Sequence, residues 1–153
     1  MNLFPCHFQH MECPLRRYEL AVHQLLNEAA AICEQMPAAP QNRFVCWIVI
    51  EETQPGSLTC GGKDMKNQVL PCIAILYIPA GVLDGASRAR YVELVHGAFK
   101  QAMPADDKRQ LATSVVLHDV AEGTWGASGV IWRLPELAKA VGFVHLQSLV
   151  HST

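Results

Sequence analysis

The sequence has few charged residues and no surplus of basic ones. Charged residues make up only 17%, and 12 Lys and Arg face 14 Asp and Glu, which leaves a net charge of −2. A protein that binds nucleic acid through its phosphates needs a concentrated excess of Lys and Arg. No basic stripe occurs along this chain. The composition therefore argues against a nucleic-acid partner.

Long apolar runs and targeting signals are missing too. The apolar run Leu70–Leu83 is interrupted by Pro71 and Pro79. It falls short of the roughly 20 apolar residues that a membrane-spanning helix needs. No basic stretch followed by an apolar stretch opens the sequence, so a secretory signal peptide is not expected. We expect a cytoplasmic protein with no membrane partner.

No pair of cysteines has the CxxC spacing of a zinc site or a redox motif. One group, from Cys6 to Cys13, combines cysteine with histidine. Adjacent strand residues such as Cys6 and His7 point to opposite faces, however, so the spacing is wrong for a zinc clasp. We expect no metal and no other cofactor, and reduced thiols at all six cysteines: Cys6, Cys13, Cys33, Cys46, Cys60 and Cys72.

Apolar residues are abundant. They make up half of the 153 residues, and the mean hydropathy of +0.14 is high for a protein that must present a polar surface. A chain of this length is expected to form one domain with its own core. The apolar excess predicts a large contact between subunits in addition.

The first part of the chain is consistent with a strand, a helix and a second strand. Residues Leu3–Phe8 are mainly apolar or aromatic, as at the start of a strand. From Pro14 onward the apolar residues follow the three-and-four spacing of a helix, which Pro37 ends. The stretch "RFVCWIVIEE" (43–52) is rich in β-branched and aromatic residues and predicts a strand, with Trp47 in the core.

The same order of elements then occurs again. The stretch "LPCIAILYI" (70–78) predicts a strand, Asp84 can cap a helix that Pro104 ends, and "TSVVLHDV" (113–120) predicts another strand. Turn residues follow both halves at one constant offset. Glu52, Gly56, Ser57 and Gly62 correspond in this way to Asp119, Gly123, Thr124 and Gly129.

We therefore expect a single domain over 1–153 with two β-α-β repeats, 1–66 and 67–130. The remainder, 131–153, contains a predicted short helix, "LPELAKAVG" (134–142), and a predicted closing strand, "FVHLQSL" (143–149).

The expected fold class is α+β, with a four-stranded sheet and two antiparallel helices on one of its faces. Right-handed crossovers place both helices on the same face. The strands at 44–50 and 71–78 are apolar at successive positions, so their other face must also be covered. A second copy of the chain is the predicted cover.

The segments "WIVIEETQPGSLTCGG" and "VVLHDVAEGTWGASG" carry a resemblance to a known family. Two β-α-β units that each close with a glycine-rich hairpin make the chain resemble the tautomerase superfamily, over residues 2 to about 130. Members include 4-oxalocrotonate tautomerase and macrophage migration inhibitory factor. The resemblance implies a homotrimer whose short β-ribbons reach onto neighbouring subunits.

The resemblance also implies proton transfer on a small 2-oxo or unsaturated carboxylic acid. In that family an amino-terminal proline is the base, because an amine in an apolar pocket stays uncharged near neutral pH. Arginines bind the substrate carboxylate. Here Asn2 stands in the proline position, and the stretch where the family carries arginines reads "YIPAGVL" (77–83).

Other residues are therefore the candidates for the site. For catalysis these are the α-amine of Met1, a water held by Asn2, and the carboxylate of Glu52. Glu51 and Glu52 face opposite sides of a strand, so only one can point into a pocket. For substrate binding we predict Arg43, Trp125 and Arg133. Packing at the trimer contact is the alternative role of Trp125, and Arg16 and Arg17 are alternatives to the two arginines.

Two functional readings stay open at this point. One is a weak tautomerase, isomerase or hydratase that works without the proline. The other is a non-catalytic member of the family, a pseudoenzyme that binds small acids or acts as a scaffold. A different native start of the chain is a third alternative.

Overall fold

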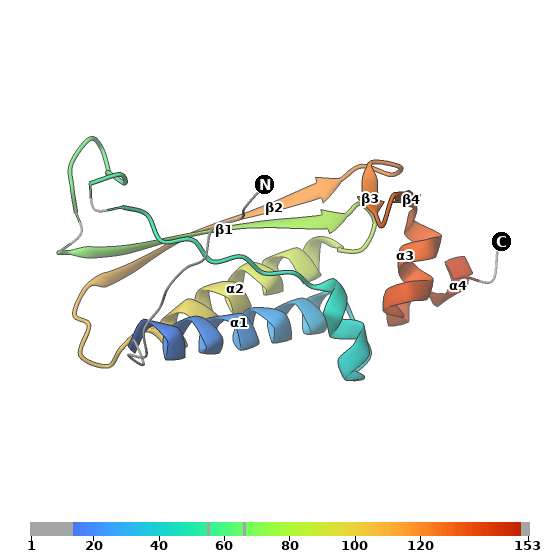
Figure 1. The fold of residues 1–153 in the computed structure, drawn as a ribbon, viewed down its shortest axis with the longest axis horizontal. Coiled ribbons are helices and arrows are strands. Elements are labelled where there is room, and N and C mark those ends of the chain that lie inside the picture. Colours follow the sequence, from blue (N-terminus) through green and yellow to red (C-terminus); the bar gives the residue numbers. More distant parts are fainter. Residues whose placement is uncertain (1–13, 55, 66, 151–153) are drawn as a thin grey trace, which may run out of the picture.

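The computed structural model describes residues 14–54, 56–65 and 67–150. Helices and strands alternate along this part of the chain (Figure 1). The α-helices are α1 (Pro14–Cys33), α2 (Gly85–Ala102), α3 (Leu134–Val141) and α4 (Gln147–Val150), and the 3₁₀ helices are η1 (Pro40–Val45) and η2 (Val144–Leu146). The strands are β1 (Val69–Pro79), β2 (Gln110–Val120), β3 (Trp125–Ala127) and β4 (Val130–Trp132).

The centre of the fold is a parallel pair of strands with two helices on one side. β1 and β2 pair from Val69 opposite Gln110 to Pro79 opposite Val120. Figure 1 shows α1 and α2 running in opposite directions on the same side of this pair. The mixed α+β class, both helices and the strands of the second half are confirmed. The described residues contain two sheets of two strands each, and not the predicted sheet of four.

Local sequence signals account for the ends of both helices. The Asp84 side chain accepts a hydrogen bond of 2.7 Å from the Ser87 backbone N–H, which caps α2 at its start. At the end of α1, Gln35 takes a left-handed conformation, with φ of 52°. The Met36 N–H then donates to the Ala31 carbonyl at 2.9 Å. This closing turn has the pattern of a Schellman motif, and it sets the direction of the chain after α1.

The core lies between the sheet and the two helices. Ile78 of β1 is 1% exposed and Val95 of α2 is fully buried. No described element covers the opposite face of β1, where Ile73, Ile75 and Tyr77 are more than half exposed. The residues of β1 that face α1 and α2 are therefore apolar because they pack in the core. The alternate residues are apolar too, but the described helices leave their face exposed.

A β-hairpin follows β2, as the stretch "EGTWGASG" predicts. β3 and β4 pair antiparallel, with Trp125 opposite Trp132. The two residues of the turn, Ser128 and Gly129, have φ of 52° and 80°. Positive φ at both central positions is the signature of a type I′ turn, which matches the twist of the flanking strands.

The loop that ends the first half has the same local geometry. Gly61 and Gly62 have φ of 57° and 77°, and Cys60 forms an isolated antiparallel bridge with Lys63. Each of these positions lies at the constant offset from its counterpart in the β3–β4 hairpin. The counterparts are Ser128, Gly129, Ala127 and Val130.

The strand predicted over 43–52 is not formed among the described residues. Residues 40–45 belong to η1, and 46–54 are extended without a strand partner among the described residues. A strand needs a partner for its backbone groups, and the partner predicted for it, Leu3–Phe8, lies outside the described residues. The expectation of a buried Trp47 is wrong, because that side chain is 88% exposed.

Of the two elements predicted after residue 130, the short helix is confirmed and the strand is wrong. The short helix is α3, which ends at Gly142 in a left-handed conformation with φ of 78°. The predicted strand over 143–149 is instead η2 followed by α4. Three apolar side chains of this segment contact the core: Phe143, Leu146 and Val150. Their spacing is helical, so a helix buries all three on one face, which a strand would not do.

Candidate functional site

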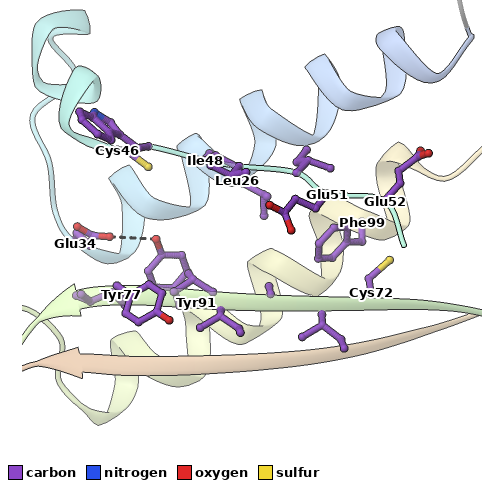
Figure 2. A pocket seen from close by; sticks show the side chains of 18 of the residues that line it. Leu26, Glu34, Cys46, Ile48, Glu51, Glu52, Cys72, Tyr77, Tyr91 and Phe99 are labelled. Atoms are coloured by element: carbon purple, nitrogen blue, oxygen red, sulfur yellow. Dashed lines mark hydrogen bonds between the residues drawn. The ribbon is translucent and has the colours of Figure 1, made fainter. Parts of the chain in front are cut away.

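A large cavity lies between the extended segment 46–54 and β1. Its volume is about 1330 Å³, which exceeds the 300 to 1,000 Å³ typical of ligand pockets. Residues of α1, α2, α3 and the β3–β4 hairpin complete its walls, and most of the lining side chains are apolar. Figure 2 shows part of this lining, with Leu26 and Ile48 in the middle of the view.

A carboxyl group is buried at one end of the cavity. Glu34 follows directly after α1 and is only 8% exposed. The Tyr91 hydroxyl of α2, itself buried, donates a hydrogen bond of 3.1 Å to Glu34 Oε1. Figure 2 shows this bond at the end of the cavity near Cys46 and Tyr77. The two side chains bring a titratable pair to the cavity wall from helices that are far apart in sequence.

Burial changes the acidity of this pair. It raises the pKa of the Glu34 carboxyl to about 7, because a charged carboxylate is poorly solvated there. The hydrogen bond from Tyr91 acts in the opposite direction and lowers this pKa. Burial also raises the pKa of the Tyr91 phenol, so that group stays protonated. At neutral pH Glu34 therefore exchanges a proton readily while Tyr91 remains a hydrogen-bond donor.

Two cysteines lie close to Glu34. Burial raises the pKa of Cys33 and of Cys46 to about 11 in each case. Thiols with such values are protonated at neutral pH and are weak nucleophiles. The expectation of reduced thiols is confirmed for the four described cysteines, which are Cys33, Cys46, Cys60 and Cys72. Cys6 and Cys13 lie outside the described residues.

The other end of the cavity carries Glu51 and Glu52, both exposed. In Figure 2 the Glu51 side chain points from the extended segment toward α2 and β1, whereas the Glu52 side chain points away from them. The two neighbours thus face opposite ways, as expected. The inward-facing one is Glu51, and Glu52 is at the rim.

The structure brings only part of the predicted site together. Trp125 lines the same cavity as Glu52. Arg43 lines a separate shallow hollow beside α1, with His23 and Glu28. Arg133 stands at the start of α3, where its N–H donates to Glu136 Oε2 at 2.9 Å, and it does not line the cavity.

The remaining predicted residues, Met1 and Asn2, lie outside the described residues, as do Cys6, His7, His10 and Cys13. Within the described part of the chain, no three His, Cys, Asp or Glu residues are grouped so as to hold a metal ion. Among the helices described here, none combines the length and apolar character that crossing a bilayer requires.

A guanidinium group also lines the cavity. Arg109 precedes β2, and its side chain binds the Asp107 carboxylate, with Nε 3.0 Å from Oδ1. The same ion pair lowers the pKa of Asp107 to about 2, through the hydrogen bonds from Arg109. The charge of Arg109 is thus already compensated within its own loop.

The pair of Glu34 and Tyr91 was missed from the sequence. Tyr91 lies within the helix predicted between Asp84 and Pro104, and a tyrosine on the buried face of a helix is an ordinary core residue. Glu34 lies four residues after Ala30, which is buried in the core. A carboxylate that continues the apolar stripe of a helix in this way is a signal that could have found it.

No family model, curated protein or solved structure matches this chain.

Proposed function

We propose that this protein is an isomerase of the tautomerase type. It moves a proton between carbon and oxygen of a small carbonyl compound, a class that includes the 2-oxo or unsaturated carboxylic acids that the resemblance implies. The observation that carries this proposal is the large apolar cavity with carboxyl groups at its ends and Trp125 of the hairpin in its wall. Apolar pockets with a few titratable groups are the usual form of such sites.

The proposal includes the finer fold, two tandem repeats that share a four-stranded sheet. Its support is the matched hairpin geometry, together with the path of residues 46–54. This segment runs opposite to β1 on the side where β1 has no partner strand (Figure 1). The strand predicted over Leu3–Phe8, which completes the proposed sheet, lies outside the described residues.

Turnover of phenylenolpyruvate is the direct test of the activity. We expect the protein to accelerate its ketonisation above the buffer rate, followed by ultraviolet absorbance. The Asn2→Pro variant is the matched comparison, because a small second residue allows removal of Met1 and would expose a terminal proline. Activity in the native protein supports a base other than proline.

A silent native protein with an active Asn2→Pro variant would contradict the proposed activity. That result would favour the second reading, a pseudoenzyme that keeps the pocket as a binding site for small acids.

We further propose a homotrimer. The exposed face of β1 supports it, since Ile73, Ile75 and Tyr77 lie in a row that a single chain leaves in water. Sedimentation equilibrium is expected to give about three times the chain mass of 16.9 kDa, and Ile75→Lys is expected to reduce it to that of one chain. Leu20→Lys, on the exposed side of α1, is the control that should leave the mass unchanged. A native protein with the mass of one chain would refute the trimer.

A further inference from the structure

We infer that Glu34 is the proton-transfer group of this cavity, held in place by Tyr91, and that its substrate is an enolisable carbonyl compound without a formal charge. This inference rests on the proposed proton-transfer function. It replaces the candidates predicted from the sequence, Met1, Asn2 and Glu52, with a residue that the fold alone brings to the cavity.

Position and burial distinguish Glu34 from the other carboxyl groups in the lining. Glu51 and Glu52 are exposed, whereas Glu34 is 8% exposed and still lines the cavity. A proton-transfer group works best in a site that excludes water, because water competes for the proton and weakens each electrostatic contact. Figure 2 shows that Glu34 and Glu52 occupy opposite ends, so they cannot act on the same atom.

The surroundings hold the Glu34 side chain in one place. The closing turn of α1 fixes its backbone, and the Gln35 carbonyl accepts a hydrogen bond of 3.0 Å from the Val144 N–H. Tyr91 fixes its carboxyl group through the bond to Oε1. Helix α1, the 3₁₀ helix η2 that follows α3, and helix α2 thus meet at Glu34 and its neighbour Gln35. Such preorganisation is what a catalytic carboxylate requires.

Within the described part of the chain, the ionisable groups that influence the Glu34 carboxyl include no cation. The Tyr91 hydroxyl faces it from α2, the Cys46 thiol from the extended segment and the Cys33 thiol from α1 itself. Tyr77 of β1 lines the same cavity, and Arg90 of α2 acts on Cys33. Desolvation accordingly dominates, and the pKa of Glu34 lies near neutrality.

The charges of the lining indicate an uncharged substrate. Three glutamates, Glu34, Glu51 and Glu52, bring carboxyl groups to the cavity. The Arg109 guanidinium in the same lining is bound to Asp107. An anion that enters such a cavity meets like charges and loses its hydration against apolar walls, and both effects oppose binding. An uncharged carbonyl compound has neither cost.

The protons and electrons of the reaction balance with Glu34 as the only proton-transfer group. The Glu34 carboxylate takes a proton from the carbon next to the carbonyl, so the C–H bond breaks and an O–H bond forms on Glu34. The electron pair of the C–H bond forms the C=C bond of an enolate, and the C=O pair moves to oxygen. Glu34 then gives the same proton to that oxygen and returns to the carboxylate. No oxidant, reductant or second reactant is needed.

The test uses the full-length protein and a matched pair of probes, phenylpyruvate and its uncharged methyl ester. We measure the keto–enol interconversion of both by ultraviolet absorbance. We expect kcat/KM for the ester to exceed that for the acid about tenfold or more, because like charges in the lining repel the acid. In Glu34→Gln we expect the ester rate to fall about 10²- to 10⁴-fold, the usual contribution of a general base. Glu28→Gln, on the exposed side of α1, should keep the native rate.

Tyr91→Phe separates a positioning role from a purely structural one. Since the hydrogen bond from Tyr91 lowers the pKa of Glu34, its loss should move the midpoint of the pH–rate profile to higher pH. A Tyr91 that served only packing would change the rate without moving that midpoint.

Each negative result would overturn a different claim. Turnover of the ester in Glu34→Gln at the native rate would overturn the role of Glu34 and leave the proposed tautomerase function standing. An acid that reacts as well as the ester would overturn the substrate class. Absence of turnover with both probes would overturn the proposed function together with this inference.

Discussion

Replacing Glu34 with Gln is expected to make the protein more stable at pH 8 and to change its stability little at pH 5. Burial raises the pKa of Glu34 from 4.5 to about 7 in the folded state. Between these values the folded protein keeps the proton and the unfolded chain loses it, so the free energy of unfolding falls as the pH rises through this window. The full loss above pH 7 is roughly 3 kcal/mol, from about 1.4 kcal/mol for each pKa unit. Glutamine cannot ionise, so it avoids this loss.

Urea unfolding at pH 5 and pH 8 measures this difference. The native protein should lose stability between the two pH values, and Glu34→Gln should lose much less. Glu28→Gln controls for a simple change of net charge, because the Glu28 side chain is exposed. Equal pH dependence in the native protein and Glu34→Gln would show that Glu34 ionises normally. The buried pair would then not hold a proton near neutral pH.

Shortening Ile78 to alanine is expected to lower the free energy of unfolding by about 2 to 5 kcal/mol. The Ile78 side chain is 1% exposed and packs in the core cluster with Val95 and Tyr91. Its removal leaves a void that the rigid strand pair cannot collapse to fill, so a cavity cost adds to the lost burial. Thermal or urea unfolding at low protein concentration measures the change.

Two further variants make the comparison specific. Ile78→Val removes one methylene group and should cost about 0.5 to 1.5 kcal/mol. Ile75→Ala lies on the other face of β1, where the side chain is 56% exposed, and should cost less than Ile78→Ala in dilute solution. If Ile75→Ala cost as much as Ile78→Ala at every concentration, the assignment of inner and outer faces would be wrong.

Local signals predicted the elements whose partners are close in sequence. α1 and α2 follow from apolar spacing, and each ends near a proline, Pro37 or Pro104. β1 and β2 follow from continuous apolar runs on either side of a crossover helix. The β3–β4 hairpin follows from its turn residues, because a type I′ turn needs residues that tolerate positive φ.

The failures occurred where a distant contact decides the local structure. Residues 46–54 have the composition of a strand and an extended backbone, yet no strand partner among the described residues. Residues 143–150 are apolar enough for a strand, but the turn at the end of α1 and the core beneath it make a helical path better packed. Propensity is weak against such packing.

The same contrast between local features and distant contacts applies to the candidate site. Trp125 was predicted for substrate binding because the resemblance places an aromatic residue in the hairpin, which is a local feature, and Trp125 lines the cavity. Arg43 and Arg133 were chosen by position along the chain, which does not determine which way a side chain on another element faces. Glu34 escaped notice because its importance depends on Tyr91, which lies on a different helix.

Propensity, periodicity and turn chemistry act within a few residues, so they suffice to predict the two long helices, the parallel strands of the second half and the glycine turns. Which faces are covered and which carboxyl group is buried depends on contacts between distant elements. Burial and the pKa of Glu34 depend on side chains that meet across α1, α2 and the extended segment, and no spacing along the chain encodes that meeting.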